Sequence, residues 1–141
     1  MNICSLVWNF IGAGIFGFLI NLPVVSYYEI GTNLTADHAH AAFMGEFGML
    51  AVVSLVFALR QVSSEAHLEK MQRYLRVSFW RLNLGLSGMV VLNLFPSGVL
   101  QLPDATKNGF WHTRSADFSS RPLMVVLEWV RLPADLVFIL L

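Results

Sequence analysis

The stretch HAHAAFMGEFGMLAVVSLVFAL, residues His38 to Leu59, is the strongest structural signal in the chain. It is long enough to cross a bilayer as a helix, which takes about 20 residues, and its only charged residue is Glu46. The rest of the chain has the same character, since 56% of its 141 residues are hydrophobic and only 13% are charged. The mean hydropathy is +0.63. These values indicate an integral membrane protein that contacts a lipid bilayer.

Other apolar runs predict further crossings, and we expect an all-α membrane protein in which the helices form one bundle. The expected four transmembrane helices cover residues 6–25, 36–60, 79–102 and 122–141. The tripeptide NLP at Asn21–Pro23 is expected to stop the first helix, and Pro96 is a candidate kink in the third. The fourth helix carries charges in its first half, and its apolar part runs directly into Leu141. We therefore expect a truncated last span, with N-terminal helices of the same protein as partners.

Loop charge predicts the orientation of the bundle. Five basic residues surround the connection between the second and third spans: Arg60, Lys70, Arg73, Arg76 and Arg81. The connection between the first two spans has none, so the basic one is expected to be cytoplasmic. The Lys and Arg residues are scattered, which argues against a nucleic-acid partner. A disulfide framework is excluded because Cys4 is the only cysteine.

Two histidines, His38 and His40, open the second span. On a helix, residues two apart point about 200° from each other, so the two rings cannot bind one ion together. They can bind two different centres, and a haem iron with an axial histidine is a centre of suitable size. A smooth strip on the His38 side could lie against a flat haem, and bulky residues flank His40. The strip consists of Ala41, Ala42 and Gly45, and the bulky residues are Phe43, Met44 and Phe47. The alternative is that both histidines are interfacial and the small residues serve helix packing.

The stretch NLPVVSYYEIGTNLTADHAHAAFMGEFG resembles the tenth-helix region of the haem-copper oxidase superfamily. The Ala between the histidines resembles the nitric oxide reductase branch. Three further stretches are similar to the last four helices of the quinol-dependent, single-subunit nitric oxide reductases: LFPSGVLQL, FWHTRSADF and WVRLPADLVF. The resemblance covers nearly the whole chain.

This resemblance implies roles for both histidines. His38 would be the axial ligand of the high-spin haem b3 iron, and His40 a ligand of the low-spin haem b iron. The implied reaction is the reduction of two NO to N2O and water with electrons from quinol, in the bacterial inner (cytoplasmic) membrane. A non-haem iron would be held by residues outside this chain, so the chain alone is expected to be inactive. The alternative function is a non-catalytic, membrane haem-binding or structural helical protein.

Acidic residues near the histidines depart from the family pattern. Asp37 is expected either to favour the helix start through the helix dipole or to orient an imidazole. Glu46 is a candidate proton-relay carboxylate that burial would hold neutral. Ala134 replaces a glycine that the resemblance implies.

Two arginines, Arg114 and Arg131, are candidates for pairing with haem propionates through charge-assisted hydrogen bonds. The alternative for Arg131 is an ion pair along one helix face, because Glu128, Arg131 and Asp135 are spaced at i, i+3 and i+7. The histidines of the polar segments, His67 and His112, are expected to be solvated.

Overall fold

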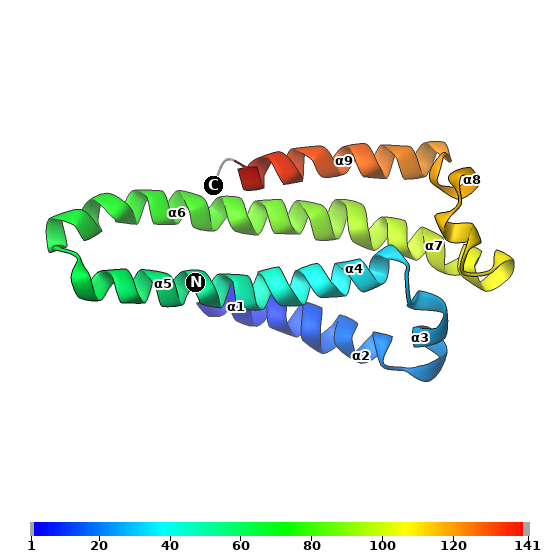
Figure 1. Cartoon of the computed structure of the whole chain (residues 1–141), viewed down its shortest axis with the longest axis horizontal. Coiled ribbons are helices and arrows are strands. Elements are labelled where there is room, and N and C mark those ends of the chain that lie inside the picture. Colours follow the sequence, from blue (N-terminus) through cyan, green and yellow to red (C-terminus); the bar gives the residue numbers. More distant parts are fainter. Residues whose placement is uncertain (1, 140–141) are drawn as a thin grey trace.

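A computed structural model of the chain describes residues 2–139 and shows a bundle of long helices, with no strand among the described residues. Three of its helices are long and apolar enough to cross a membrane. They run side by side, and a fourth helix, α9, lies against the third (Figure 1). The expected all-α membrane fold is confirmed.

The first long helix consists of α1 (Asn2–Asn9), the π-helical stretch η1 (Phe10–Phe16) and α2 (Gly17–Ile20). Its end is closed by Asn21, whose Nδ2 donates a hydrogen bond to the carbonyl of Gly17 at 2.5 Å. Pro23 then starts a separate short helix, α3 (Pro23–Glu29), at the N-terminal position that proline favours. The expected stop at NLP is therefore confirmed, and the boundary expected at residue 25 is wrong because Pro23 begins a new helix.

The second long helix contains α4 (Asn33–Ala39), η2 (His40–Gly48, π-helical) and α5 (Met49–Val62). Thr32 caps its start by accepting a hydrogen bond from the backbone N–H of Leu34. The apolar segment runs over Asn33–Val62, a little beyond the expected 36–60 at both ends.

The third long helix is continuous through α6 (Glu65–Ser87), η3 (Gly88–Leu94, π-helical) and α7 (Phe95–Asn108). The expected span of 79–102 is only its central part. The charged residues from 65 to 78, which precede the expected span, are helical too. Pro96 lies within the continuous helix, as the second residue of α7.

The chain reaches the last helix through η4 (His112–Arg114) and α8 (Ala116–Ser119). Helix α9 (Pro122–Ile139) begins at the expected proline. Leu140 and Leu141, which complete the expected fourth span, lie outside the described residues. Because of its charged residues, α9 is not one of the three helices that qualify as membrane spans by length and composition.

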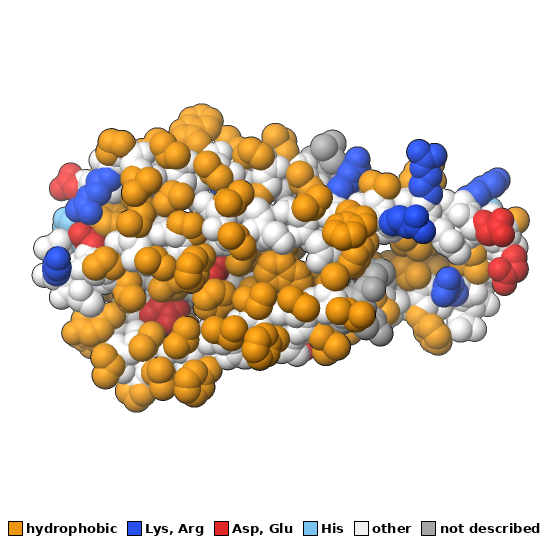
Figure 2. Space-filling view, turned by 180° about the vertical axis from the view of Figure 1, so that it is seen from behind, with side chains coloured by type: hydrophobic (Ala, Val, Ile, Leu, Met, Phe, Trp, Pro, Cys, Tyr) orange, Lys and Arg blue, Asp and Glu red, His pale blue; other side chains and the backbone are white. Residues whose placement is uncertain are grey.

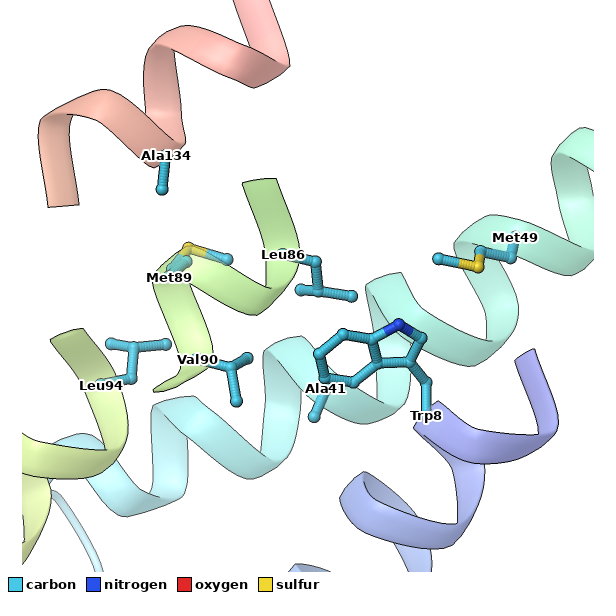
Figure 3. Packing of buried hydrophobic residues seen from close by; sticks show 8 residues of the cluster. All are labelled: Trp8, Ala41, Met49, Leu86, Met89, Val90, Leu94 and Ala134. Carbon is cyan, nitrogen blue, oxygen red and sulfur yellow. The ribbon is translucent and has the colours of Figure 1, made fainter. Parts of the chain in front are cut away.

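The core of the bundle lies where all four helices meet (Figure 3). Trp8 of α1 packs against Ala41 of η2, and Ala134 of α9 approaches Met89 of η3. The face of the bundle shown in Figure 2 is largely apolar, and most of its Lys and Arg side chains lie towards the two ends. This pattern suits a bilayer, with apolar atoms along the hydrocarbon and charges at its two borders.

Candidate functional site

The candidate site is built on the first turns of the second long helix, which α7 holds in place. The backbone N–H of Asn33 donates to Oε1 of Gln101 at 2.6 Å, and its Nδ2 donates to Oγ of Ser97 at 2.7 Å. Gly98, between these two partners, faces Leu34 so closely that a Cβ at Gly98 would lie 2.5 Å from the Leu34 nitrogen. The helix that carries His38 and His40 therefore starts from a fixed position.

His38 makes a hydrogen bond across to the first long helix. Its Nδ1 lies 2.8 Å from the carbonyl oxygen of Gly12. A carbonyl only accepts, so Nδ1 carries the proton and the lone pair lies on Nε2. The ring also lies beside Gly17, where an added Cβ would be 3.3 Å from His38 Cε1. Both features leave the half-buried His38 with Nε2 as its ligating atom.

His40 has the same tautomer from a different partner. Its Nδ1 lies 2.7 Å from the carbonyl oxygen of Ala36, one turn earlier in the same helix. The ring borders a shallow hollow of about 230 Å³ lined by Ala39, His40, Phe43 and Met44. Phe43, which lines this hollow, is 67% exposed. His40 therefore also offers Nε2, beside an open apolar surface.

The two rings lie in different surroundings, as their helical spacing predicts. His38 contacts the first long helix, whereas His40 borders the hollow at Phe43 and Met44. A single neutral imidazole with a free Nε2 is the donor that a haem iron takes from histidine. The chemistry of the two donors thus fits one haem iron at each ring.

The strip of small residues serves helix packing, and the expectation that a haem lies against it is wrong. Ala41, Ala42 and Gly45 are all buried. A Cβ at Gly12 would lie 2.6 Å from the nitrogen of Ala42, and a Cβ at Gly45 would lie 2.5 Å from Cβ of Trp8. The small side chains let the first two long helices come into backbone contact.

Asp37 takes neither of its expected roles. It is completely buried, and both carboxylate oxygens lack a hydrogen-bond partner within the described residues. It does not lie at the helix start, because it is the fifth residue of α4, beyond the first turn in which the helix dipole favours an acid. It does not orient an imidazole either, because both Nδ1 atoms bond to backbone carbonyls. Its carboxyl group lies sealed in the interior next to the histidine pair.

Glu46 has a polar partner on the first long helix. Its Oε1 accepts a hydrogen bond from Nδ2 of Asn9 at 2.8 Å, and its backbone carbonyl accepts one from Ser5 at 3.4 Å. This pairing ties η2 to α1 inside the apolar segments. A role of Glu46 in proton transfer stays a prediction.

The two candidate arginines lie in separate places. Arg114 donates from Nε and Nη2 to the carbonyl of Gly31 at 3.0 and 2.7 Å, and its guanidinium stacks over the ring of Phe110. Arg131 donates from Nε to Oδ2 of Asp135 at 3.0 Å, as expected for an ion pair along one helix face. Both side chains are exposed. Their pairing with propionates stays a prediction.

The described residues contain no group of three or more His, Cys, Asp or Glu placed to hold a metal ion. Any metal at His38 or His40 would therefore need a prosthetic group or ligands from elsewhere. The haem fits this requirement, because its four ring nitrogens accompany the iron.

Comparison with known proteins supports the same interpretation. Residues 1–137 match the family described as cytochrome c and quinol oxidase polypeptide I. The chain belongs to this family. A curated relative, a nitric oxide reductase subunit of Stutzerimonas stutzeri, is 28% identical over 144 residues, which cover 95% of this chain and 28% of the relative. The chain thus spans less than a third of the length of that family member.

Two buried polar groups near the ends of the helices were not predicted from the sequence. His112 is not simply solvated: its Nδ1 lies 2.6 Å from Oδ2 of the buried Asp104, which also accepts from Arg121 at 3.3 Å. Glu29 is 3% exposed, and burial raises the pKa of its carboxyl group, a rise that the nearby His38 partly offsets. The His112–Asp104 pair and the Glu29–His38 pair do not have the i, i+3 or i+4 spacing of neighbours on one helix face. No sequence pattern therefore predicts them.

Proposed function

We propose that the chain is the C-terminal part of a quinol-dependent nitric oxide reductase and supplies one axial histidine to each of two haems. His38 binds the iron of haem b3 and His40 the iron of haem b. The observation that supports this proposal most directly is that both rings hold their Nδ1 proton against a backbone carbonyl, which leaves the lone pair of each ring on Nε2. The family match and the similarity to a nitric oxide reductase support this proposal.

The overall reaction balances as two NO, two electrons and two protons giving N2O and water. Haems held by His38 and His40 would supply the redox chemistry: the one at His38 would take the substrate, and the one at His40 would pass electrons to it. The chain's own part is to hold the two histidines on one helix, so that the distance between the two centres is fixed by a rigid element.

His38 and His40 differ in how firmly they are held. The partner of His38, Gly12, belongs to another helix, so its ring is fixed by the contact between two helices. The partner of His40, Ala36, is in the same helix, so its ring needs no neighbouring helix for its orientation. A hydrogen bond from Nδ1 to a carbonyl also raises the basicity of Nε2, which strengthens its bond to iron.

Three parts of the proposal come from outside the chain. The second axial ligand of haem b, the ligands of the non-haem iron and the remaining helices belong to an N-terminal part of the protein. Quinol is proposed as the electron donor because LFPSGVLQL, FWHTRSADF and WVRLPADLVF resemble the quinol-dependent branch. The proposed location is the bacterial inner membrane.

The test replaces each histidine by leucine in the protein purified from its native membrane. His40→Leu should abolish the low-spin haem band and keep a haem that reacts with carbon monoxide, and His38→Leu should do the reverse. Both should stop NO consumption with reduced quinol. His67→Leu is the matched control, because His67 is an exposed residue of α6. Identical spectra in the wild type and all three variants would contradict the proposal and favour a structural membrane protein.

A further inference from the structure

A hollow of about 490 Å³ lies at the end of the bundle where α3 meets the end of α7. Its wall consists of Tyr27, Tyr28, Ile30, Ala105, Thr106, Gly109 and Phe110. The volume falls within the range of about 300–1,000 Å³ that small-molecule sites occupy. The hollow is separate from the histidine pair, so this inference does not depend on haem binding.

A guanidinium group lies against one wall residue of the hollow, Phe110. Arg114 stacks over the ring of Phe110, with its Cζ 4.7 Å from the ring centre, and donates two hydrogen bonds to the carbonyl of Gly31. Gly31 follows Ile30 of the hollow in sequence. A guanidinium has five N–H donors, so three remain without a partner within the described residues. These donors form a fork suited to an anion such as a phosphate.

Gly31 is what permits this arrangement. Its φ of +86° lies in the region that favours glycine. A Cβ there would collide with the Arg114 guanidinium and the Phe110 ring. The guanidinium is therefore held against the Phe110 ring by its two hydrogen bonds to the Gly31 carbonyl.

The hollow lies at the border between apolar and polar parts of the bundle. The first apolar segment ends at Ile20, the second begins at Asn33, and α7 ends at Asn108. Tyr27 is 76% exposed and Trp111 is 78% exposed beside the hollow. Exposed Tyr and Trp rings are typical of the membrane–water interface.

Nearby charge favours an anion. Figure 2 shows Lys and Arg side chains at both ends of the bundle. Lys107 lies in the last turn of α7, Arg114 in η4 and Arg121 directly before α9. The buried Asp104 is paired with His112 and Arg121. The exposed acidic residue of the connecting segment is Asp117.

We infer that this hollow binds an anionic phospholipid, with the phosphate on the Arg114 guanidinium and the glycerol and upper acyl carbons against Tyr27, Tyr28 and Phe110. A phospholipid is the amphipathic anion that a bilayer presents at this depth. Its phosphate accepts hydrogen bonds from the guanidinium, and its apolar carbons cover the aromatic wall of the hollow.

The experiment uses protein purified from its native membrane and measures lipid binding by native mass spectrometry and by the shift in thermal unfolding. The probes are phosphatidylglycerol, phosphatidylcholine and inorganic phosphate. Phosphatidylglycerol should bind and raise the unfolding temperature. Arg114→Gln should weaken its binding about tenfold or more, because a charge-assisted hydrogen bond is lost. Arg73→Gln, with the same change of charge on an exposed residue of α6, should bind like the wild type.

A second variant distinguishes a loss of lipid binding from a loss of the fold. Thr106→Trp fills the hollow from an exposed position and leaves the bonds between Arg114 and Gly31 intact. It should lose phosphatidylglycerol binding while keeping the haem spectrum of the wild type.

Four results would overturn the inference. Equal binding of phosphatidylcholine and phosphatidylglycerol would mean that the charge is unused, and an equal shift with inorganic phosphate would identify free phosphate as the ligand. Equal losses in Arg73→Gln and Arg114→Gln would indicate general surface charge. Unchanged lipid binding with an altered haem spectrum in Arg114→Gln would assign this cation to a haem propionate.

Discussion

The Nδ1 atom of His38 lies 2.8 Å from the carbonyl oxygen of Gly12, on a different helix and 26 residues earlier in the chain. Gly12 is also the point where the first two long helices come into backbone contact. The orientation of a candidate iron ligand and the closest helix contact thus depend on the same residue.

Gly12→Ala should disturb both the orientation of the His38 ring and the contact between the first two long helices. An added Cβ would lie 2.6 Å from the Ala42 nitrogen and 2.9 Å from Ala41 Cβ, so the helices must separate. We expect a loss of about 1–3 kcal/mol in stability, as for other overpacked sites, measured by thermal unfolding, and a changed high-spin haem spectrum. Gly48→Ala is the control, because the atom nearest to its added Cβ would be 3.7 Å away. Equal effects of both substitutions would contradict this role of Gly12.

Asp37→Leu should raise the stability of the protein. Leucine has a similar size and removes two buried carboxylate oxygens that have no hydrogen-bond partner in the described part of the chain. A buried polar group without a partner costs about 1–3 kcal/mol, and denaturant unfolding would measure the gain. A loss of stability, with Asp37→Asn behaving like the wild type, would show that this side chain holds a hydrogen-bonded group.

Glu29 should make stability depend on pH. Burial raises the pKa of its carboxyl group above the ordinary value of 4.5, and the nearby His38 partly offsets this rise. A raised pKa means that the folded state favours the protonated acid, so this stabilisation is full below pH 4.5 and is lost as the pH rises through the folded-state pKa. Glu29→Gln should therefore unfold at increasingly higher temperature than the wild type as the pH is raised from about 4 to about 8. A difference that stays constant over this range would disprove the assignment.

The connection between α5 and α6 should lie in the cytoplasm. Ser63 and Ser64 form this short connection, next to the basic residues of both helices. In a Cys4→Ser background, Ser63→Cys should react with an impermeant maleimide only after the cells are opened. Reaction in intact spheroplasts would reverse the proposed topology and place the histidine pair at the inner face.

The helices and their approximate positions follow from the sequence because apolar length and helix-stopping residues are local signals. The stop at Asn21–Pro23 and the start at Pro122 are both found in the structure. The third helix starts at Glu65, before the expected span, and apolar length does not predict this start because a helix outside the hydrocarbon can carry charges that end an apolar run.

Contacts between helices could be predicted only in part. The spacing of His38 and His40 predicts their different surroundings, since it depends on helix geometry alone. The bond to Gly12 and the pairing of His112 with Asp104 depend on how distant segments pack. The strip of Ala41, Ala42 and Gly45 fits a haem or a helix equally well by pattern, and only the position of Trp8 decides for the helix.

The third long helix spans Glu65–Asn108, or 44 residues. At 1.5 Å per residue it is about 66 Å long, about twice the thickness of a bilayer's hydrocarbon core. Its N-terminal turns must therefore stand in water as a stiff extension of a membrane helix. A soluble helical protein fused in helical register at the connection of Ser63 and Ser64 would inherit the orientation of the bundle, and would serve as an alignment marker for electron cryomicroscopy of a membrane protein that is otherwise mostly hidden by detergent.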